Sequence, residues 1–114
     1  MIATNTAFWK AFFDPGNPDH ERARTDILLF DKEKVVLSQL VLSEVLSWLV
    51  ARGKMAQRDW FLDYAANTAN VRVFGCGDEE FAVLSELARY ENTDLAGASV
   101  KYLRRYMNCE VTEY

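Results

Sequence analysis

The chain has 114 residues, of which 50% are hydrophobic, 26% charged and 13% aromatic, with five Gly and two Pro. Low-complexity disorder, collagen and mucin-like stalks need more Gly, Pro or Ser and fewer aromatic residues, so this composition predicts one globular domain spanning residues 1–114. Thirteen Lys and Arg against 17 Asp and Glu give a formal charge of −4, which argues against a protein that coats nucleic acid through a broadly basic surface.

The predicted elements alternate short apolar segments with helical periods. Asp14 precedes a Pro-Gly-Asn-Pro turn that stops the first helix, and Gly53 ends the helix that begins near Ser38. Asp19 and Asp78 are expected to cap the helices that follow them. In chain order we predict a strand at 1–4, helices at 8–13 and 20–30, a strand at 34–38, helices at 38–53 and 54–66, a strand at 71–74, helices at 78–90 and 95–106, and a strand at 108–112.

The spacing of these elements predicts an α/β fold. Strands separated by one or two helices cannot pair as tight hairpins, so crossovers join them into a mostly parallel sheet. Helices then cover both faces of a short central sheet, which is a three-layer α/β/α sandwich. Ligand sites in such sheets lie beyond the carboxyl ends of the strands, at the point where the strand order reverses. The residues directly after each strand are therefore the first to consider.

Neither cysteine chemistry nor a membrane location is indicated. Cys76 and Cys109 lack a C-x-x-C spacing, and His20 is the only histidine, so no zinc site or Cys-His pair is expected. Two free, half-buried thiols in a reducing compartment fit better. No apolar run approaches the roughly 18 residues of a membrane span, and the N-terminus lacks the pattern of a signal peptide. We expect a cytoplasmic protein that does not contact the membrane.

Four segments, at residues 2–8, 14–23, 43–46 and 94–100, together resemble the PIN domain. More narrowly, the chain resembles the VapC-type toxin ribonucleases of prokaryotic toxin–antitoxin pairs. The resemblance covers nearly the whole chain, from residue 1 to residue 112. It implies a Mg²⁺- or Mn²⁺-dependent endonuclease that acts on single-stranded RNA, forms a homodimer and binds an antitoxin. It also implies that the third strand lies at one edge, with the first two strands between it and the fourth.

The chain departs from this family at its acidic positions. Asn5 stands where the family carries its first catalytic Asp, and Gly97 stands where the third motif carries its main acid. Glu44 matches its expected position, and Asp94 matches an Asp that often lies three residues before the missing acid. Tyr114 occupies the place of the Asp in a Thr-x-Asp motif, with Glu113 beside it as a further acid. The chain then stops where family members continue into another strand, so it looks truncated as well as degenerate.

The resemblance makes Asn5, Glu44 and Asp94 the candidate catalytic and metal-binding residues, with Mg²⁺ or Mn²⁺ held weakly. Mg²⁺ prefers oxygen ligands, and Asn5 keeps an oxygen but loses a negative charge. Each residue also has a structural interpretation. Asn5 and Asp94 are favourable N-caps for the helices that follow them, and Glu44 also fits a solvated helix position.

A basic helix face provides candidate RNA-binding residues. Lys101, Arg104 and Arg105 recur at helical spacing beside Tyr102 and Tyr106, so they could hold phosphate while tyrosines stack on bases. A plain solvated face is the alternative. Helical spacing places most of the large aromatic residues of the early helices in the core, but they exceed what a small core easily hides, and some of them could line a dimer surface or a partner groove. They are Trp9, Phe12, Phe13, Trp48, Trp60 and Phe61.

Two functional hypotheses follow. The first is a PIN-domain endoribonuclease with a degenerate acidic site and weak or lost catalysis. The second is a catalytically inactive PIN-fold module that binds an antitoxin, a second copy of the chain or RNA. The sequence leaves open whether the protein is an enzyme. A flavodoxin-like or response-regulator-like domain would need an acidic pair after the first strand and a phosphorylatable Asp, and neither is present.

Overall fold

The computed structural model describes residues 1–114 and contains a four-stranded sheet with helices on both faces. Most predicted elements are found at or near their expected positions. The elements are β1 (Ile2–Ala3), α1 (Thr6–Phe13), α2 (His20–Leu29), the 3-10 turn η1 (Phe30–Lys32), β2 (Val35–Ser38), α3 (Gln39–Ala51), α4 (Met55–Asn67), β3 (Val71–Phe74), α5 (Asp78–Tyr90), α6 (Leu95–Tyr106) and β4 (Glu110–Val111).

The sheet has the strand order β3-β2-β1-β4, and every neighbouring pair is parallel. The register places Ile2 opposite Val35 on one side and opposite Glu110 on the other. The expected parallel sheet and strand order are both confirmed. The chain moves from β1 through β2 to β3 in one direction and then returns to the far side of β1 for β4. The strand order therefore reverses at β1.

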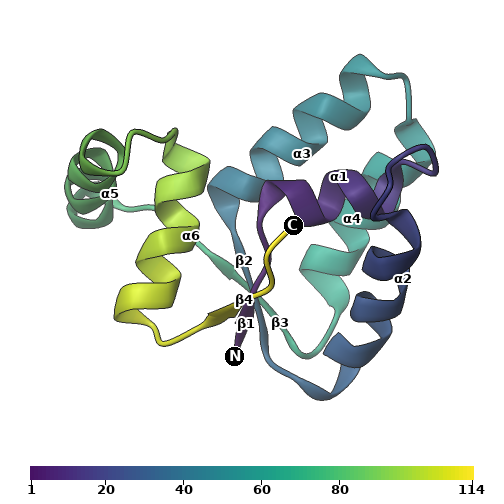
Figure 1. The fold of residues 1–114 in the computed structure, drawn as a ribbon, viewed down its shortest axis with the longest axis horizontal. Coiled ribbons are helices and arrows are strands. Elements are labelled where there is room, and N and C mark those ends of the chain that lie inside the picture. Colours follow the sequence, from purple (N-terminus) through teal and green to yellow (C-terminus); the bar gives the residue numbers. More distant parts are fainter.

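Both faces of β2 are buried, because alternate side chains point into different cores. Val35 and Leu37 belong to the larger cluster, which is formed with α1, α3 and α4. Val36 belongs to a smaller cluster with Ala3 of β1 and Leu103 of α6. Figure 1 shows the resulting layers, with α5 and α6 on one side of the strands and α1, α2 and α4 on the other.

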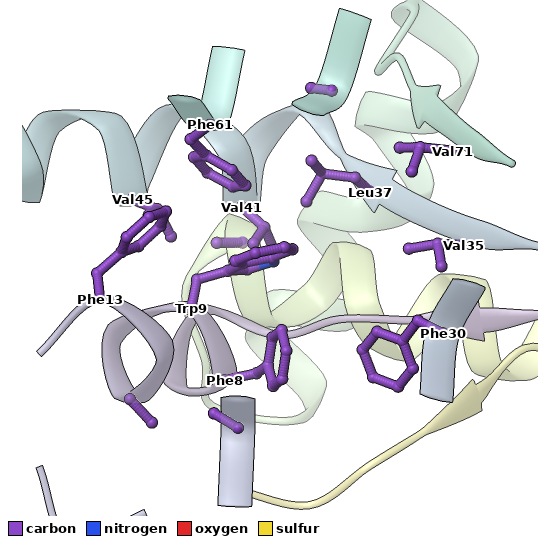
Figure 2. Close-up of a cluster of buried hydrophobic side chains, with 14 of the residues drawn as sticks. Phe8, Trp9, Phe13, Phe30, Val35, Leu37, Val41, Val45, Phe61 and Val71 are labelled. Atoms are coloured by element: carbon purple, nitrogen blue, oxygen red, sulfur yellow. The ribbon is translucent and has the colours of Figure 1, made fainter. Parts of the chain in front are cut away.

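The larger core is built around the aromatic residues of α1. Trp9 is fully buried and lies with its ring centroid 4.5 Å from that of Phe61 on α4. Its indole N–H donates a hydrogen bond of 2.8 Å to the hydroxyl of Thr4, so the polar edge of the ring is also satisfied. Phe8 packs edge-on against the Trp9 ring, at 4.8 Å between centroids. Figure 2 shows these rings meeting the side chains of β2 and α3.

A buried pair of hydroxyl groups joins α6 to the sheet. The Ser38 hydroxyl, at the end of β2, donates to the Ser99 hydroxyl at 2.6 Å. Ser99 in turn donates to the carbonyl oxygen of Ala96 at 2.6 Å. No buried side-chain polar atom in the structure lacks a partner. Because buried polar groups are costly unless paired, this link fixes the first turn of α6 relative to β2.

The observed helix ends agree with the predicted capping residues at some positions and differ from them at others. Gly53 has φ 69° just after α3, which is the left-handed conformation expected of a helix-ending glycine. Asp19 precedes α2 as predicted, but its side chain makes no capping hydrogen bond. Asp78 is the first residue of α5 and Gly77 is the N-cap, so the predicted Asp78 cap is wrong by one position. The Asp78 charge still lies in the first turn, where the helix dipole favours it.

The cysteines are free, as the sequence predicts. Cys109 is buried beside β4, and burial raises the pKa of its thiol above the usual value. No helix in the structure has both the length and the apolar composition needed to cross a membrane.

Candidate functional site

A cavity of about 270 Å³ lies beyond the carboxyl ends of β1 and β4. The start of α1, the middle of α3, α6 as far as Arg104, and the end of β4 with the segment after it contribute its walls. The structure therefore brings together the three residues that the sequence singles out from distant parts of the chain. The polar and charged residues of the lining are Asn5, Thr6, Glu44, Asp94, Lys101, Arg104 and Glu113.

The sheet topology explains the position of this cavity. The strand order reverses at β1, and the crevice beside such a reversal is where open parallel sheets bind ligands. β3 lies at the opposite edge, two strands away from β1. Residues 76–78, which directly follow β3, are absent from the cavity lining for this reason. Only some of the segments that follow strands can therefore share a site.

Asn5 and Asp94 both act as helix N-caps. The Asn5 side-chain oxygen accepts a hydrogen bond of 2.8 Å from the backbone N–H of Phe8. The Asp94 Oδ1 atom accepts one of 2.7 Å from the backbone N–H of Gly97. The structural interpretation of both residues is thus correct. Each cap also fixes its side chain at the cavity wall, because a capping side chain must turn back over the first turn of its helix.

Glu44 reaches the cavity from the second turn of α3. It is half-buried and follows the exposed Ser43, while the next residue, Val45, is fully buried. Glu44 therefore lies at the border between the buried face and the solvated face of the helix. From this border its carboxylate faces the first turns of α1 and α6 across the cavity.

The segment after β4 holds Glu113 at the cavity. Arg104 donates a hydrogen bond of 3.1 Å to the Glu113 carboxylate, and Arg22 donates one of 2.8 Å to the Glu113 carbonyl oxygen. The ring of Tyr114 lies 4.2 Å from the Arg22 guanidinium and its hydroxyl donates to Asp26. Desolvation, followed by the bond to Asp26, raises the pKa of Tyr114. Tyr114 thus stays neutral and anchors the end of the chain to α2. The family resemblance implies a carboxylate at this position.

The basic residues of α6 divide between two places. Lys101 and Arg104 line the cavity, but Arg105 does not. Lys101 and Arg105 both pair with Glu91, at 3.5 Å and 3.6 Å, and Arg104 pairs with Glu113. All three cations are roughly half exposed, so these ion pairs contribute only about 0–1 kcal/mol each. A phosphate group could replace the carboxylate at such a pair at little cost.

The donor set does not fit a resident divalent cation. A hard ion such as Mg²⁺ is held by carboxylates with waters and substrate oxygens. No three Asp, Glu, His or Cys side chains lie close enough together to hold an ion. The only side-chain oxygen of Asn5 already caps α1, one oxygen of Asp94 caps α6, and Gly97 supplies none. The chain therefore falls short of the acidic set that the family resemblance implies.

Comparison with known proteins identifies the fold. No protein-family model matches the chain, and no curated protein matches it by sequence. A solved structure does match, that of Mycobacterium tuberculosis VapC20, a toxin that cleaves the sarcin-ricin loop. The two superimpose with a TM-score of 0.78 at 21% sequence identity, over 100% of this chain and 89% of VapC20. The chain has a PIN-like fold. At this identity the match establishes the architecture, and the residues of the cavity must carry any statement about activity.

Within this PIN-like fold, one residue that lines the cavity and one beside its wall stand apart from the three candidate metal-binding residues. Glu113 is a third carboxylate, and its position after β4 is a signal that the sequence does contain. Thr93 lies directly before the Asp94 cap, and its hydroxyl lies against Gly97. Nothing in the sequence singles out Thr93, because the contact depends on how α5 ends and α6 begins.

Proposed function

We propose that this protein is a PIN-fold relative of toxin ribonucleases whose cleavage of single-stranded RNA is weak or lost. One observation carries the proposal. Asn5, Glu44 and Asp94 line a single cavity at the reversal of strand order, but they form an incomplete acidic set. The place of the site is thus retained while its charge is reduced. An amide at position 5 and a glycine at position 97 account for the two missing negative charges.

RNA binding at the cavity rim is the part of the function that survives such a loss. Lys101 and Arg104 lie beside the cavity, and Tyr102 and Tyr106 lie on the same helix, 5.0 Å apart between ring centroids. Tyr106 is 58% exposed and so has a free ring face for a base. Phosphate contacts of this kind depend on charge and not on metal. We therefore expect weak, salt-sensitive binding of single-stranded RNA that persists in a chelator.

Cleavage of an end-labelled single-stranded RNA tests the proposal. We expect the protein to produce little or no more cleavage in Mn²⁺ or Mg²⁺ than its Glu44→Gln variant purified in the same way. Binding of the same RNA should persist in EDTA and should fall at least tenfold in a Lys101→Ala, Arg104→Ala double variant. Gel analysis of products and fluorescence anisotropy of binding provide the two measurements.

One pattern would contradict the proposal directly. Complete metal-dependent digestion of the RNA by the unmodified protein, lost both in chelator and in the Glu44→Gln variant, would show a fully working active site. Cleavage that is equal in the two proteins would instead indicate a contaminating nuclease, since both carry the same impurities. Glu44→Gln is a suitable control because the amide keeps the shape of the side chain and removes only its charge.

An exposed aromatic surface supports the second candidate function, a partner-binding module. Trp60 on α4 is 43% exposed, although Trp9 and Phe61 of the same aromatic cluster are fully buried. Two grooves of about 350 and 410 Å³ lie on either side of it, and both are lined by Trp60 and Phe12. Neighbouring Leu28 on α2 is 70% exposed. Apolar exposure on this scale is typical of an interaction site.

The charges around this surface indicate what would bind there. Asp31 and Asp63 line the groove of about 350 Å³, which lies between α2 and α4 beside Tyr64. Burial and the nearby Asp31 carboxylate raise the pKa of Tyr64 to about 12, so its hydroxyl stays neutral near pH 7. An apolar groove with an acidic rim fits an amphipathic helix whose flanks are basic. We propose an antitoxin-like helix of this kind as the occupant.

A peptide experiment tests this surface. A labelled amphipathic helix, with Leu on one face and Lys on its flanks, should bind with micromolar affinity, while a scrambled peptide of the same composition should not. Trp60→Ala should weaken binding at least tenfold, and Trp48→Ala, which removes a tryptophan from α3, should not. Equal binding of both peptides would contradict the proposal. A second copy of the chain is the other possible occupant, and a solution mass of twice 13.1 kDa that is lost in Trp60→Ala would indicate it.

A further inference from the structure

Gly97 is a glycine for a steric reason. It is the third residue of α6, and the only glycine with a positive φ in the chain is Gly53. The backbone at position 97 thus suits any residue. A Cβ atom built there would lie 2.3 Å from the Thr93 hydroxyl oxygen and 3.2 Å from Asp94 Oδ1. The first separation is far shorter than real Cβ contacts, so a side chain at 97 requires Thr93 to move.

The backbone of Thr93 is fixed by the way α5 ends. Asn92 adopts the left-handed conformation, with φ 51°. The Thr93 N–H bonds the carbonyl of Ala88 at 3.0 Å, and the Asn92 N–H bonds that of Arg89 at 3.4 Å. This pair of bonds is the Schellman motif that ends many helices. Asp94 follows at once as the N-cap of α6, so Thr93 is held between two fixed helix ends.

The Thr93 side chain also has few rotamers that would make room for a side chain at position 97. A β-branched side chain carries two γ atoms, so two of its three staggered rotamers place a γ atom towards Gly97. The Thr93 Cβ atom itself would lie 3.4 Å from a new Cβ at position 97, which is tolerable. The main obstruction is therefore the Thr93 γ oxygen and not the backbone, since Asp94 Oδ1 at 3.2 Å needs to move by only a few tenths of an ångström. Removing that atom alone should make room for a side chain.

We propose that Thr93 is a positioning residue that keeps position 97 free of a side chain and thereby holds the cavity in its low-charge form. The proposal rests on the proposed function, since it concerns the position where the resemblance implies an acid. It adds that restoring an acidic side chain at position 97 takes two substitutions, one at position 97 and one at Thr93. An Asp at position 97 can reach the cavity only when Thr93 is smaller.

A thermal unfolding cycle tests the steric part without reference to metal or RNA. Gly97→Ala should leave Tm unchanged or lower it in the natural background, although alanine normally stabilises a helix relative to glycine. The same change should raise Tm by a few degrees in a Thr93→Ala background. In a Thr93→Val background, which keeps both γ atoms, it should again give no gain. Equal effects of Gly97→Ala in all three backgrounds would overturn the proposal.

Binding of Mn²⁺ tests the part that concerns the site. We compare Asn5→Asp, Gly97→Asp with the same pair carrying Thr93→Ala or Thr93→Val. The Thr93→Ala protein should bind Mn²⁺ at least tenfold more tightly than the other two. A difference in Tm without any difference in Mn²⁺ affinity would overturn control of the site by Thr93. Equally tight Mn²⁺ binding in all three proteins would also overturn it, while supporting the acidic site itself; absence of Mn²⁺ binding in all three would count against the proposed function as well.

Discussion

Replacing Trp9 with alanine should lower the free energy of unfolding by about 3–5 kcal/mol, which is the usual cost of removing a large buried aromatic side chain. Trp9 is fully buried and packs against rings from α1 and α4. Its loss also leaves the Thr4 hydroxyl without its donor at the end of β1. Because a domain of this size is typically stable by about 5–15 kcal/mol, this loss should remove a large fraction of its stability.

Urea denaturation followed by far-ultraviolet circular dichroism measures this loss without relying on tryptophan fluorescence. Trp48→Ala is the matched control, since Trp48 is only half-buried and its ring lies 4.5 Å from the exposed Arg52 guanidinium. We expect that variant to lose about 1–2 kcal/mol. Trp9→Phe should fall between the two, because it retains ring packing and loses the hydrogen bond. Equal losses for Trp9→Ala and Trp48→Ala would mean that the aromatic cluster of α1 is not the core.

The arrangement of elements was predictable because it depends on local periodicity and on general rules of chain connection. Each strand is followed by a helical period, so parallel pairing follows without knowledge of the contacts. The strand order came from the family resemblance, and the pairing of β1 with both β2 and β4 confirms it. The lengths of the strands were harder to predict from the sequence. β4 was expected over residues 108–112 but covers only Glu110–Val111, because ladder bonds also require a neighbouring strand and β1 itself spans only Ile2–Ala3.

The candidate site was predictable to the level of which residues meet, and no further. Asn5 and Glu44 follow neighbouring parallel strands that end at one edge of the sheet, and the start of α6 brings Asp94 to the same cavity. Their role in binding an ion remains a prediction. What the sequence could not provide is the state of each side chain, such as the ion pair of Arg104 with Glu113. These contacts depend on rotamers and helix ends, which tertiary packing decides.

The aromatic residues illustrate the same limit. Helical spacing correctly placed Trp9, Phe13 and Phe61 in the core, where all three are buried. It could not separate them from Trp60, which lies one residue before Phe61 and is 43% exposed. Adjacent residues on a helix point about 100° apart, so one can face the core while the other reaches the surface. The apolar surface on α4 therefore emerges only from the packing of α4 against α1.

Position 5 lacks a negative charge for binding a metal ion, whereas the shape and placement of its side chain are already suitable. Asn5→Asp should therefore increase affinity for Mn²⁺ by at least about tenfold, equivalent to roughly 1.4 kcal/mol. The fold should be unaffected, because Asp and Asn are equally good N-caps and the bond from the Phe8 N–H can be kept. The added charge lies in a cavity with Glu44 and Asp94, where attraction for a divalent ion exceeds that at an open surface.

Isothermal titration with Mn²⁺ provides the measurement, and Asn17→Asp provides the matched control. Asn17 also accepts a backbone hydrogen bond with its side-chain oxygen, from the Asp19 N–H at 2.9 Å, but it does not line the cavity. The two variants have the same net charge and differ only in where the charge lies. Asn17→Asp should leave Mn²⁺ affinity unchanged, and adding Glu44→Gln to Asn5→Asp should cancel the gain. An equal gain in Mn²⁺ affinity in both single variants would show a general effect of net charge. The cavity would then not be a specific binding site for the ion.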